Sequence, residues 1–187
     1  LSWTGSNEGG LDEKECDLVQ VMHQAYNMLC HQAAEKDITF SVDCGGVQHQ
    51  RVYSDQQKLR QVILYLAQNA ITYTKPGGNV SLLAIEQEKL PNGYSVYQLE
   101  VRDTGVGIGD DFLGHLFEPF AREKNTTFSG VHGMGLGLTI TKHIVDMLRG
   151  TIEVESQIGK GTAFTVSLRL RTHKLGVEEA VPVDGAC

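Results

Sequence analysis

Gly133-Met-Gly-Leu-Gly-Leu-Thr-Ile140 places three glycines at alternate positions, directly before an apolar pattern. The apolar residues recur at one-turn spacing: Leu136, Ile140, Ile144 and Leu148, with Val145 alongside. This spacing predicts a helix over residues 136–148 that ends at Gly150. Glycine lets a backbone approach a ligand closely, and the first N–H groups of a helix have no partner within it. The stretch therefore suits a phosphate chain, although glycine-rich turns also serve simply to pack a helix.

The composition is that of an ordinary globular chain. It has 187 residues, 41% of them hydrophobic, which predicts one domain. The net charge of −7 argues against nucleic acid as a partner. No apolar run approaches the roughly 20 residues of a membrane-spanning helix. The four cysteines and seven histidines lack C-x-x-C and H-x-x-x-H spacing, which argues against a disulfide framework or a zinc site. We expect a monomeric cytoplasmic fragment, whose parent protein could be membrane-anchored.

Hydrophobic periodicity predicts both helices and strands in the rest of the chain. Helical spacing is found in three segments: 17–36, 55–73 with Asp55 as its N-cap, and 110–116. Strand-like alternation is found in six: 38–42, 51–53, 79–87, 94–102, 151–156 and 162–170. We therefore expect an α+β fold. It would be a two-layer α/β sandwich with a mixed, mostly antiparallel sheet and about three helices on one face.

Asp103 stands where a predicted strand ends and a glycine turn begins. Its carboxylate could accept a hydrogen bond from the exocyclic amine of a purine. Gly105 and Gly107 would let a flat ring lie against the backbone. The alternative is an aspartate that caps its own turn, which is common.

Asn69 and Tyr73 lie one turn apart on the predicted helix 55–73. An asparagine in mid-helix is mildly unfavourable, because its side chain competes for backbone hydrogen bonds. Its amide oxygen is a suitable ligand for Mg²⁺, and Tyr73 could cover a base or ribose. The alternatives are a solvent-facing asparagine and a tyrosine at the edge of the core.

Residues 117–132 have little periodicity, and a loop of this length inside a compact domain is usually functional. Phe117-Glu-Pro-Phe120 places two aromatics at its start, and Arg122 could reach phosphate oxygens. The alternative is a hydrophobic anchor for the loop beside a solvated arginine.

In this order, four stretches resemble the motifs of the catalytic ATP-binding domain of sensor histidine kinases, of the Bergerat-fold (GHKL) superfamily. Leu59-Arg-Gln-Val-Ile-Leu-Tyr-Leu-Ala-Gln-Asn-Ala-Ile-Thr-Tyr-Thr74 resembles the N box and Asp103-Thr-Gly-Val-Gly107 the G1 box. Phe117-Glu-Pro-Phe120 resembles the F box and Gly133-Met-Gly-Leu-Gly-Leu138 the G2 box, while Gly161-Thr-Ala-Phe164 is similar to the closing strand. The general pattern is similar to that of bacterial hybrid sensor kinases.

The resemblance implies a division of the chain into segments. Residues 1–11 would be a linker at the end of an upstream dimerisation helix. Residues 12–171 would be the catalytic ATP-binding domain, with its ATP lid at about 117–135. Residues 172–187 would be a disordered tail.

The resemblance also implies a role for each matching position. Asn69 would be the catalytic residue that holds Mg²⁺, and Asp103 would bind the adenine amine, with Thr162 nearby through water. The implied nucleotide-binding residues are Asn69, Tyr73, Asp103, Gly105, Gly107, Ile108, Phe120, Arg122, Gly133, Met134, Gly135, Leu136, Gly137, Leu138 and Thr162. The implied cofactors are ATP and Mg²⁺, and the reaction transfers the γ-phosphoryl group to a histidine. ATP or ADP, an upstream dimerisation and phosphoacceptor domain and the receiver domain of a response regulator would be the partners.

Two positions depart from the family's pattern. Tyr65 stands one turn before Asn69, where histidine kinases usually have Asn and the hydrolysing relatives have Glu, and Thr72 stands where Lys or Arg is frequent. The absence of Glu argues against a gyrase-like or chaperone-like ATPase. His23 and His31 lack the acidic residue and proline that follow the family's acceptor histidine, so the acceptor is expected outside this chain. The alternative functions are a nucleotide-sensing pseudokinase and an anti-sigma-type serine kinase.

Overall fold

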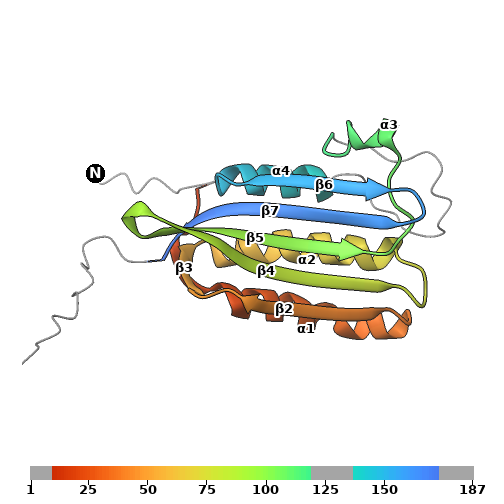
Figure 1. The fold of residues 1–187 in the computed structure, drawn as a ribbon, viewed down its shortest axis with the longest axis horizontal. Helices are drawn as coiled ribbons and strands as arrows, with labels where there is room; N and C mark the ends of the chain where they lie inside the picture. Colours follow the sequence, from red (N-terminus) through yellow and green to blue (C-terminus); the bar gives the residue numbers. More distant parts are fainter. Residues whose placement is uncertain (1–9, 119–136, 173–187) are drawn as a thin grey trace, which may run out of the picture.

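The computed structural model describes residues 10–118 and 137–172, and in this part of the chain seven strands form one sheet (Figure 1). The strands are β1 Lys14–Asp17, β2 Thr39–Gly46, β3 Arg51–Ser54, β4 Asn79–Leu90, β5 Tyr94–Asp103, β6 Thr151–Gln157 and β7 Gly161–Arg171. Their order in the sheet is β1-β3-β7-β5-β4-β2, and β6 pairs with β7. β2 and β4 run parallel, whereas the other described pairs are antiparallel. The predicted mixed, mostly antiparallel sheet is therefore confirmed.

Three helices of the described ranges cover one face of the sheet (Figure 1). They are α1 Leu18–Glu35, α2 Gln56–Tyr73 and α4 Gly137–Met147; α3 Asp110–Leu113 and the 3-10 turn η1 Pro91–Gly93 are short. The Asp17 side chain accepts the backbone N–H of Gln20 at 3.0 Å, and Asp55 accepts that of Lys58 at 3.1 Å. Both aspartates thus satisfy an N–H group that the first turn leaves free. The two-layer sandwich and the N-cap at Asp55 are confirmed.

The core lies between the helices and the inner face of the sheet. Its largest fully buried side chains include Leu18, Met22, Leu59, Ile63, Leu66, Leu82, Tyr97 and Leu168. The stripe of α2 runs through Leu59, Val62, Ile63, Leu66 and Ala70, all at most 4% exposed. Because burial of each large apolar side chain contributes about 1.5–3 kcal/mol, this stripe fixes α2 against the sheet. The opposite face of the helix is left to present polar side chains.

The structure departs from the sequence expectations in several elements. β1 was not predicted, because only Cys16 of its four residues is buried and its pairing with β3 is long-range. β2 continues to Gly46 through an irregularity after Asp43, and α3 ends at Leu113 instead of residue 116.

The buried face of α4 also differs from the one that the apolar residues at one-turn spacing predicted. This face carries Thr141, Ile144 and Val145, whereas Ile140 is 47% exposed. Thr141 is tolerated there because its hydroxyl donates to the carbonyl of Gly137 at 2.8 Å.

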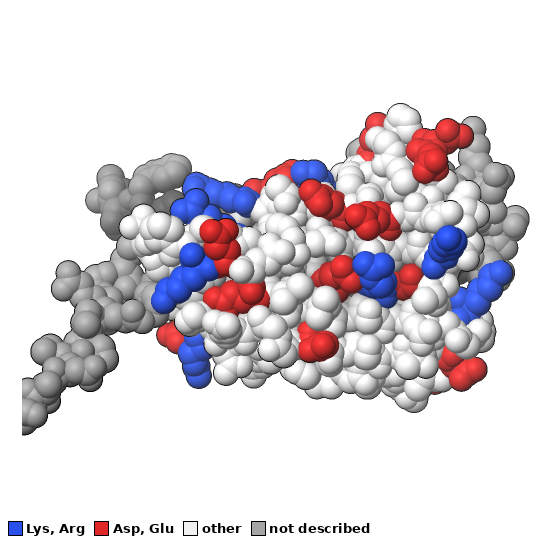
Figure 2. Space-filling view, viewed as in Figure 1, with Lys and Arg blue, Asp and Glu red and all other residues white. Residues whose placement is uncertain are grey.

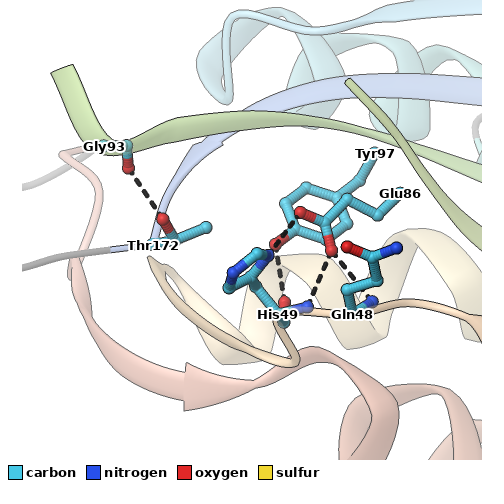
Figure 3. A network of polar contacts seen from close by, with 6 residues as sticks. All are labelled: Gln48, His49, Glu86, Gly93, Tyr97 and Thr172. Carbon is cyan, nitrogen blue, oxygen red and sulfur yellow. Dashed lines mark hydrogen bonds and ion pairs between the residues drawn. The ribbon is translucent and has the colours of Figure 1, made fainter. Parts of the chain in front are cut away.

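A partly buried polar network holds the end of the sheet where β4 and β5 form their hairpin (Figure 3). The Glu86 carboxylate accepts the backbone N–H groups of Gln48 at 2.9 Å and His49 at 2.7 Å, and lies 2.7 Å from the His49 ring. The Tyr97 hydroxyl donates to the His49 carbonyl at 2.6 Å. Burial opposes ionisation of Glu86, but the hydrogen bonds from His49 and Gln48 outweigh it and hold its pKa below the ordinary value. The network ties the β2–β3 connection to β4 and β5.

The face of the sheet away from the helices carries charges of both signs (Figure 2). Arg102, for example, forms a 2.9 Å ion pair with Glu100 on this face. Acidic side chains gather around α3, whose first turn contains Asp110 and Asp111 (Figure 2). Within residues 10–118 and 137–172, no helix combines the length and apolarity that crossing a membrane requires.

Candidate nucleotide-binding site

Asp103 is the last residue of β5 and is only 8% exposed. One carboxylate oxygen, Oδ1, accepts the backbone N–H of Gly105 at 2.8 Å and that of Thr162 at 3.2 Å. Burial raises the pKa of Asp103 above its ordinary value, although these two hydrogen bonds act in the opposite direction. The other oxygen, Oδ2, accepts no hydrogen bond from the residues that the structure describes. Asp103 therefore caps its own turn, which was the alternative interpretation of this residue. Its second carboxylate oxygen is still available as an acceptor for a ligand.

The glycine turn after Asp103 packs between the end of α2 and the β6–β7 turn. A Cβ atom on Gly105 would collide with the carbonyl oxygen of Tyr73, which also accepts the N–H of Val106 at 3.2 Å. Gly107 has a φ of +76°, and a Cβ there would collide with the carbonyl of Gln157. Both positions therefore require glycine, and the turn lies close to both neighbouring segments.

Thr162 pairs directly opposite Asp103 and belongs to a chain of hydroxyl contacts. Its Oγ1 lies 2.7 Å from the Oγ of Ser156, which accepts the N–H of Ile108 at 2.7 Å and donates to the carbonyl of Gly161 at 3.0 Å. Since the single Ser156 proton is used on Gly161, Thr162 must donate to Ser156. The lone pairs of the Thr162 oxygen remain as acceptors beside Asp103. Ser156 was not predicted from the sequence, because a serine near a strand end carries no distinctive signal.

Ile108 was expected to shape the base pocket, and it lies at the rim of the glycine turn. With Gly109, Asp110 and the segment 156–158 it lines a hollow of about 260 Å³. Ile158, which lines this hollow from the β6–β7 turn, is 67% exposed.

Three side chains on one face of α2 continue the site: Tyr65, Asn69 and Tyr73, each half-buried and spaced by one turn. The Asn69 side chain forms no hydrogen bond with any described residue. Burial raises the pKa of the Tyr65 hydroxyl, and the neighbouring Tyr73 adds to the shift. On this face of α2, the polar Asn69 is therefore flanked by an aromatic side chain one turn before it and another one turn after it.

Lys36 was not anticipated as part of the site's framework. Its ammonium donates to the carbonyl oxygens of Ile71 at 2.9 Å and Thr72 at 2.7 Å, at the end of α2. Burial lowers the pKa of this lysine. The contact satisfies carbonyl groups that a helix terminus leaves free and stabilises the last turn of α2, which carries Tyr73.

Gly137 and Leu138 begin α4, and Leu138 packs against the core. The Thr139 hydroxyl donates to the carbonyl of Phe117 at 2.9 Å, which fixes the start of the predicted lid to this helix. The remaining candidates lie outside the described residues: Phe120, Arg122, Gly133, Met134, Gly135 and Leu136. The structure thus brings Asp103, Gly105, Gly107, Ile108 and Thr162 together beside Tyr73, with Asn69 one turn away.

The chain is similar in sequence to a known protein family and to known sensor kinases. Residues 54–172 match the family described as histidine kinase-, DNA gyrase B- and HSP90-like ATPase. The chain is 38% identical over 156 residues to the autoinducer 2 sensor kinase/phosphatase LuxQ of Vibrio parahaemolyticus, covering 83% of this chain and 18% of LuxQ. It is 30% identical over 161 residues to the sensor histidine kinase YclK of Bacillus subtilis, covering 86% of this chain and 32% of YclK. The chain therefore spans only a part of these relatives.

Solved structures agree with this relationship. Full-length ShkA in complex with AMPPNP superposes with a TM-score of 0.73 at 26% identity, covering 87% of this chain and 32% of ShkA. The nucleotide-free catalytic domain of the histidine kinase ThkA gives a TM-score of 0.70 at 23% identity, covering 84% of this chain and 95% of that domain, and supports the fold alone. The chain belongs to the histidine kinase-, DNA gyrase B- and HSP90-like ATPase family, and within it is an ATP-binding catalytic domain of the sensor histidine kinase type.

Proposed function

We propose that this chain binds ATP with Mg²⁺ where β5 ends and β7 begins, and donates the γ-phosphoryl group to a histidine on a separate domain. The observation that carries the proposal is the buried Asp103, with Oδ1 held by two backbone N–H groups and Oδ2 left to accept. The exocyclic amine of adenine is a donor that matches this acceptor. The relationship to ShkA, whose structure holds AMPPNP, supports a nucleotide as the ligand.

Asn69 fits the metal that this reaction implies. Its half-buried side chain has no partner among the described residues, and Mg²⁺ commonly binds one or two protein oxygens together with phosphates and waters. Mg²⁺ supplies neutralisation of phosphate charge when it is bound. The chain's own residues orient the nucleotide: Asp103 and Thr162 hold the base, and Gly105 and Gly107 admit its flat face. Tyr73 would cover the base or ribose from α2.

The phosphoryl acceptor and the downstream partner are also proposals. We assign the acceptor histidine to a dimerisation domain upstream of residue 12 and the next acceptor to the receiver domain of a response regulator. In this scheme residues 12–171 are the catalytic unit, residues 117–135 its lid and residues 172–187 a tail. The fragment acts as a monomer in the cytoplasm, where ATP is available.

The test is a calorimetric titration of the chain with ATP in Mg²⁺ and again in EDTA, followed by transfer to a supplied phosphoacceptor domain. Binding in the micromolar range that weakens in EDTA, and an acid-labile phosphorylated product, would support the proposal. An acid-stable product would indicate a serine kinase. Absence of binding in both buffers would refute the nucleotide site itself.

A nucleotide-sensing pseudokinase is the second candidate, because Tyr65 occupies the position where histidine kinases usually carry Asn. On this hypothesis the chain binds nucleotide and transfers poorly. A Tyr65→Asn variant that transfers much faster than the parent would support it, whereas equal or slower transfer would oppose it.

A further inference from the structure

Tyr65 and Gly137 form a contact between α2 and α4 that the sequence did not suggest. The outer end of the Tyr65 ring lies so close to Gly137 that a Cβ atom there would overlap the ring atoms Cζ and Cε2 and the hydroxyl oxygen. A side chain at position 137 would therefore require the Tyr65 ring to move. The two residues are complementary in shape.

Both sides of this contact are firmly held. Tyr65 lies on α2 between Ile63 and Leu66, which are both fully buried, so its place on the helix is set by the core. Gly137 is held through its carbonyl, which accepts the Thr141 hydroxyl at 2.8 Å. Thr141 is itself buried, on the inner face of α4. The contact therefore fixes the spacing between the start of α4 and α2.

This spacing matters because Asn69 lies one turn beyond Tyr65. The first N–H groups of α4 are unpaired within the helix and carry its positive dipole end. A ligand that binds both these groups and Asn69 depends on the distance between them, and shifts of about 1 Å can cost two orders of magnitude in rate.

We propose that Tyr65 is a positioning residue for phosphate binding: the tip of its ring supports Gly137 and holds the first turn of α4 at a set distance from Asn69. This inference rests on the proposed function, and it opposes the pseudokinase hypothesis. On the pseudokinase hypothesis Tyr65 is a defect, and Asn would repair it. Here Tyr65 and Gly137 work as a pair, so Tyr65→Asn removes the support and weakens ATP binding.

The test compares ATP with adenosine, because only ATP reaches the start of α4. Calorimetric titrations would use the parent chain and its Tyr65→Phe, Tyr65→Leu and Tyr65→Ala variants. We expect Tyr65→Ala and Tyr65→Leu to weaken ATP binding roughly tenfold, the scale of one lost hydrogen bond to a charged group, and to leave adenosine binding unchanged. Tyr65→Phe keeps the ring and should behave as the parent does.

A second-site test addresses the contact itself. Gly137→Ala should weaken ATP binding in the parent, and adding Tyr65→Ala should restore part of the loss because the collision is removed. Tyr26→Ala is the matched control. It removes a half-buried ring of α1 that packs at a tilt against Phe40, and should change stability without changing the ratio of ATP to adenosine affinity.

Three outcomes would overturn the inference. One is an unchanged ATP-to-adenosine ratio in Tyr65→Leu and Tyr65→Ala. Another is a loss in Tyr65→Phe as large as in Tyr65→Ala, which would assign the effect to the hydroxyl. The third is a double variant no better than Gly137→Ala alone. A parent chain that binds neither ATP nor adenosine would instead refute the proposed function, so the two failures are distinguishable.

Discussion

Replacing Asp103 by Asn should abolish most adenine recognition without unfolding the domain. Two backbone N–H groups hold Oδ1, so an asparagine must direct its carbonyl oxygen to them and its NH₂ group to the position of Oδ2. The adenine amine then meets a donor in place of an acceptor. Loss of a hydrogen bond to a charged group costs about 1.5–3 kcal/mol, which corresponds to about a 10- to 150-fold weaker ATP affinity.

The assay is calorimetric titration with ATP together with thermal unfolding of each protein. Asp43→Asn is the matched control, because Asp43 also accepts the N–H of the glycine two residues later, Gly45, at 2.8 Å. Asp43 is exposed, however, and lies on β2, which β4 separates from β5. The control should leave ATP binding unchanged. An Asp103→Asn variant with the ATP affinity of the parent would refute the assignment of Asp103 to the base.

The same variant should alter the pH dependence of stability. Burial raises the pKa of Asp103 in the folded protein, so its contribution to stability is complete below the unfolded pKa of about 3.9 and is lost as the pH rises through the folded value. Asparagine does not titrate and avoids this loss. We expect Asp103→Asn to be at least as stable as the parent at pH 7, and to lose its advantage at pH 3. A variant clearly less stable than the parent at pH 7 would contradict this account.

Three further changes test other parts of the structure. Asn69→Ala should remove the difference in ATP affinity between titrations in Mg²⁺ and in EDTA. The control Gln68→Ala, which changes the exposed residue next to Asn69, should keep this difference. In urea unfolding, Gly107→Ala should destabilise the domain more than Gly159→Ala. A side chain at a positive φ costs about 1–2 kcal/mol at both positions, but only at position 107 would the new Cβ atom also collide with a backbone carbonyl. Glu86→Gln should reduce the loss of stability at acid pH. The lowered pKa of Glu86 gives stability that is present above the unfolded pKa of about 4.3 and is lost as the pH falls through the folded value. An unchanged loss of stability at acid pH would exclude Glu86 as its source.

Much of the fold could be predicted because its signals are local. The apolar stripe of α2 and the alternation in β5 follow directly from the periods of helix and strand. β1 could not be predicted in this way, because a short polar strand depends on its pairing with β3. Ile140 fits the apolar series of α4 but lies outside its buried face, since the hydrogen-bonded Thr141 replaces it there.

The site divides along the same line. The placement of Asp103 at a strand end and of Gly105 in a tight turn could be predicted from the sequence, and both are confirmed. Their role in binding a base stays a prediction. Ser156 and Lys36 could not be predicted, because each acts through a contact with a segment distant in sequence: Ser156 with Ile108, and Lys36 with the end of α2. The Tyr65–Gly137 contact is of the same kind.

The position of Asp103 is a consequence of strand register. Tyr97, Leu99 and Val101 point into the core at alternate positions of β5, and Asp103 continues the same series. The carboxylate therefore faces the helix layer and α2 because three apolar side chains before it are buried. A slip of one residue would turn all four side chains to the open face and expose the apolar ones, which is strongly unfavourable. The register between β5 and β7, which pairs Tyr94 with Arg171 and Asp103 with Thr162, extends this constraint along β7. The core that stabilises the sheet therefore also places the Asp103 carboxylate, which we propose binds the base, opposite Thr162.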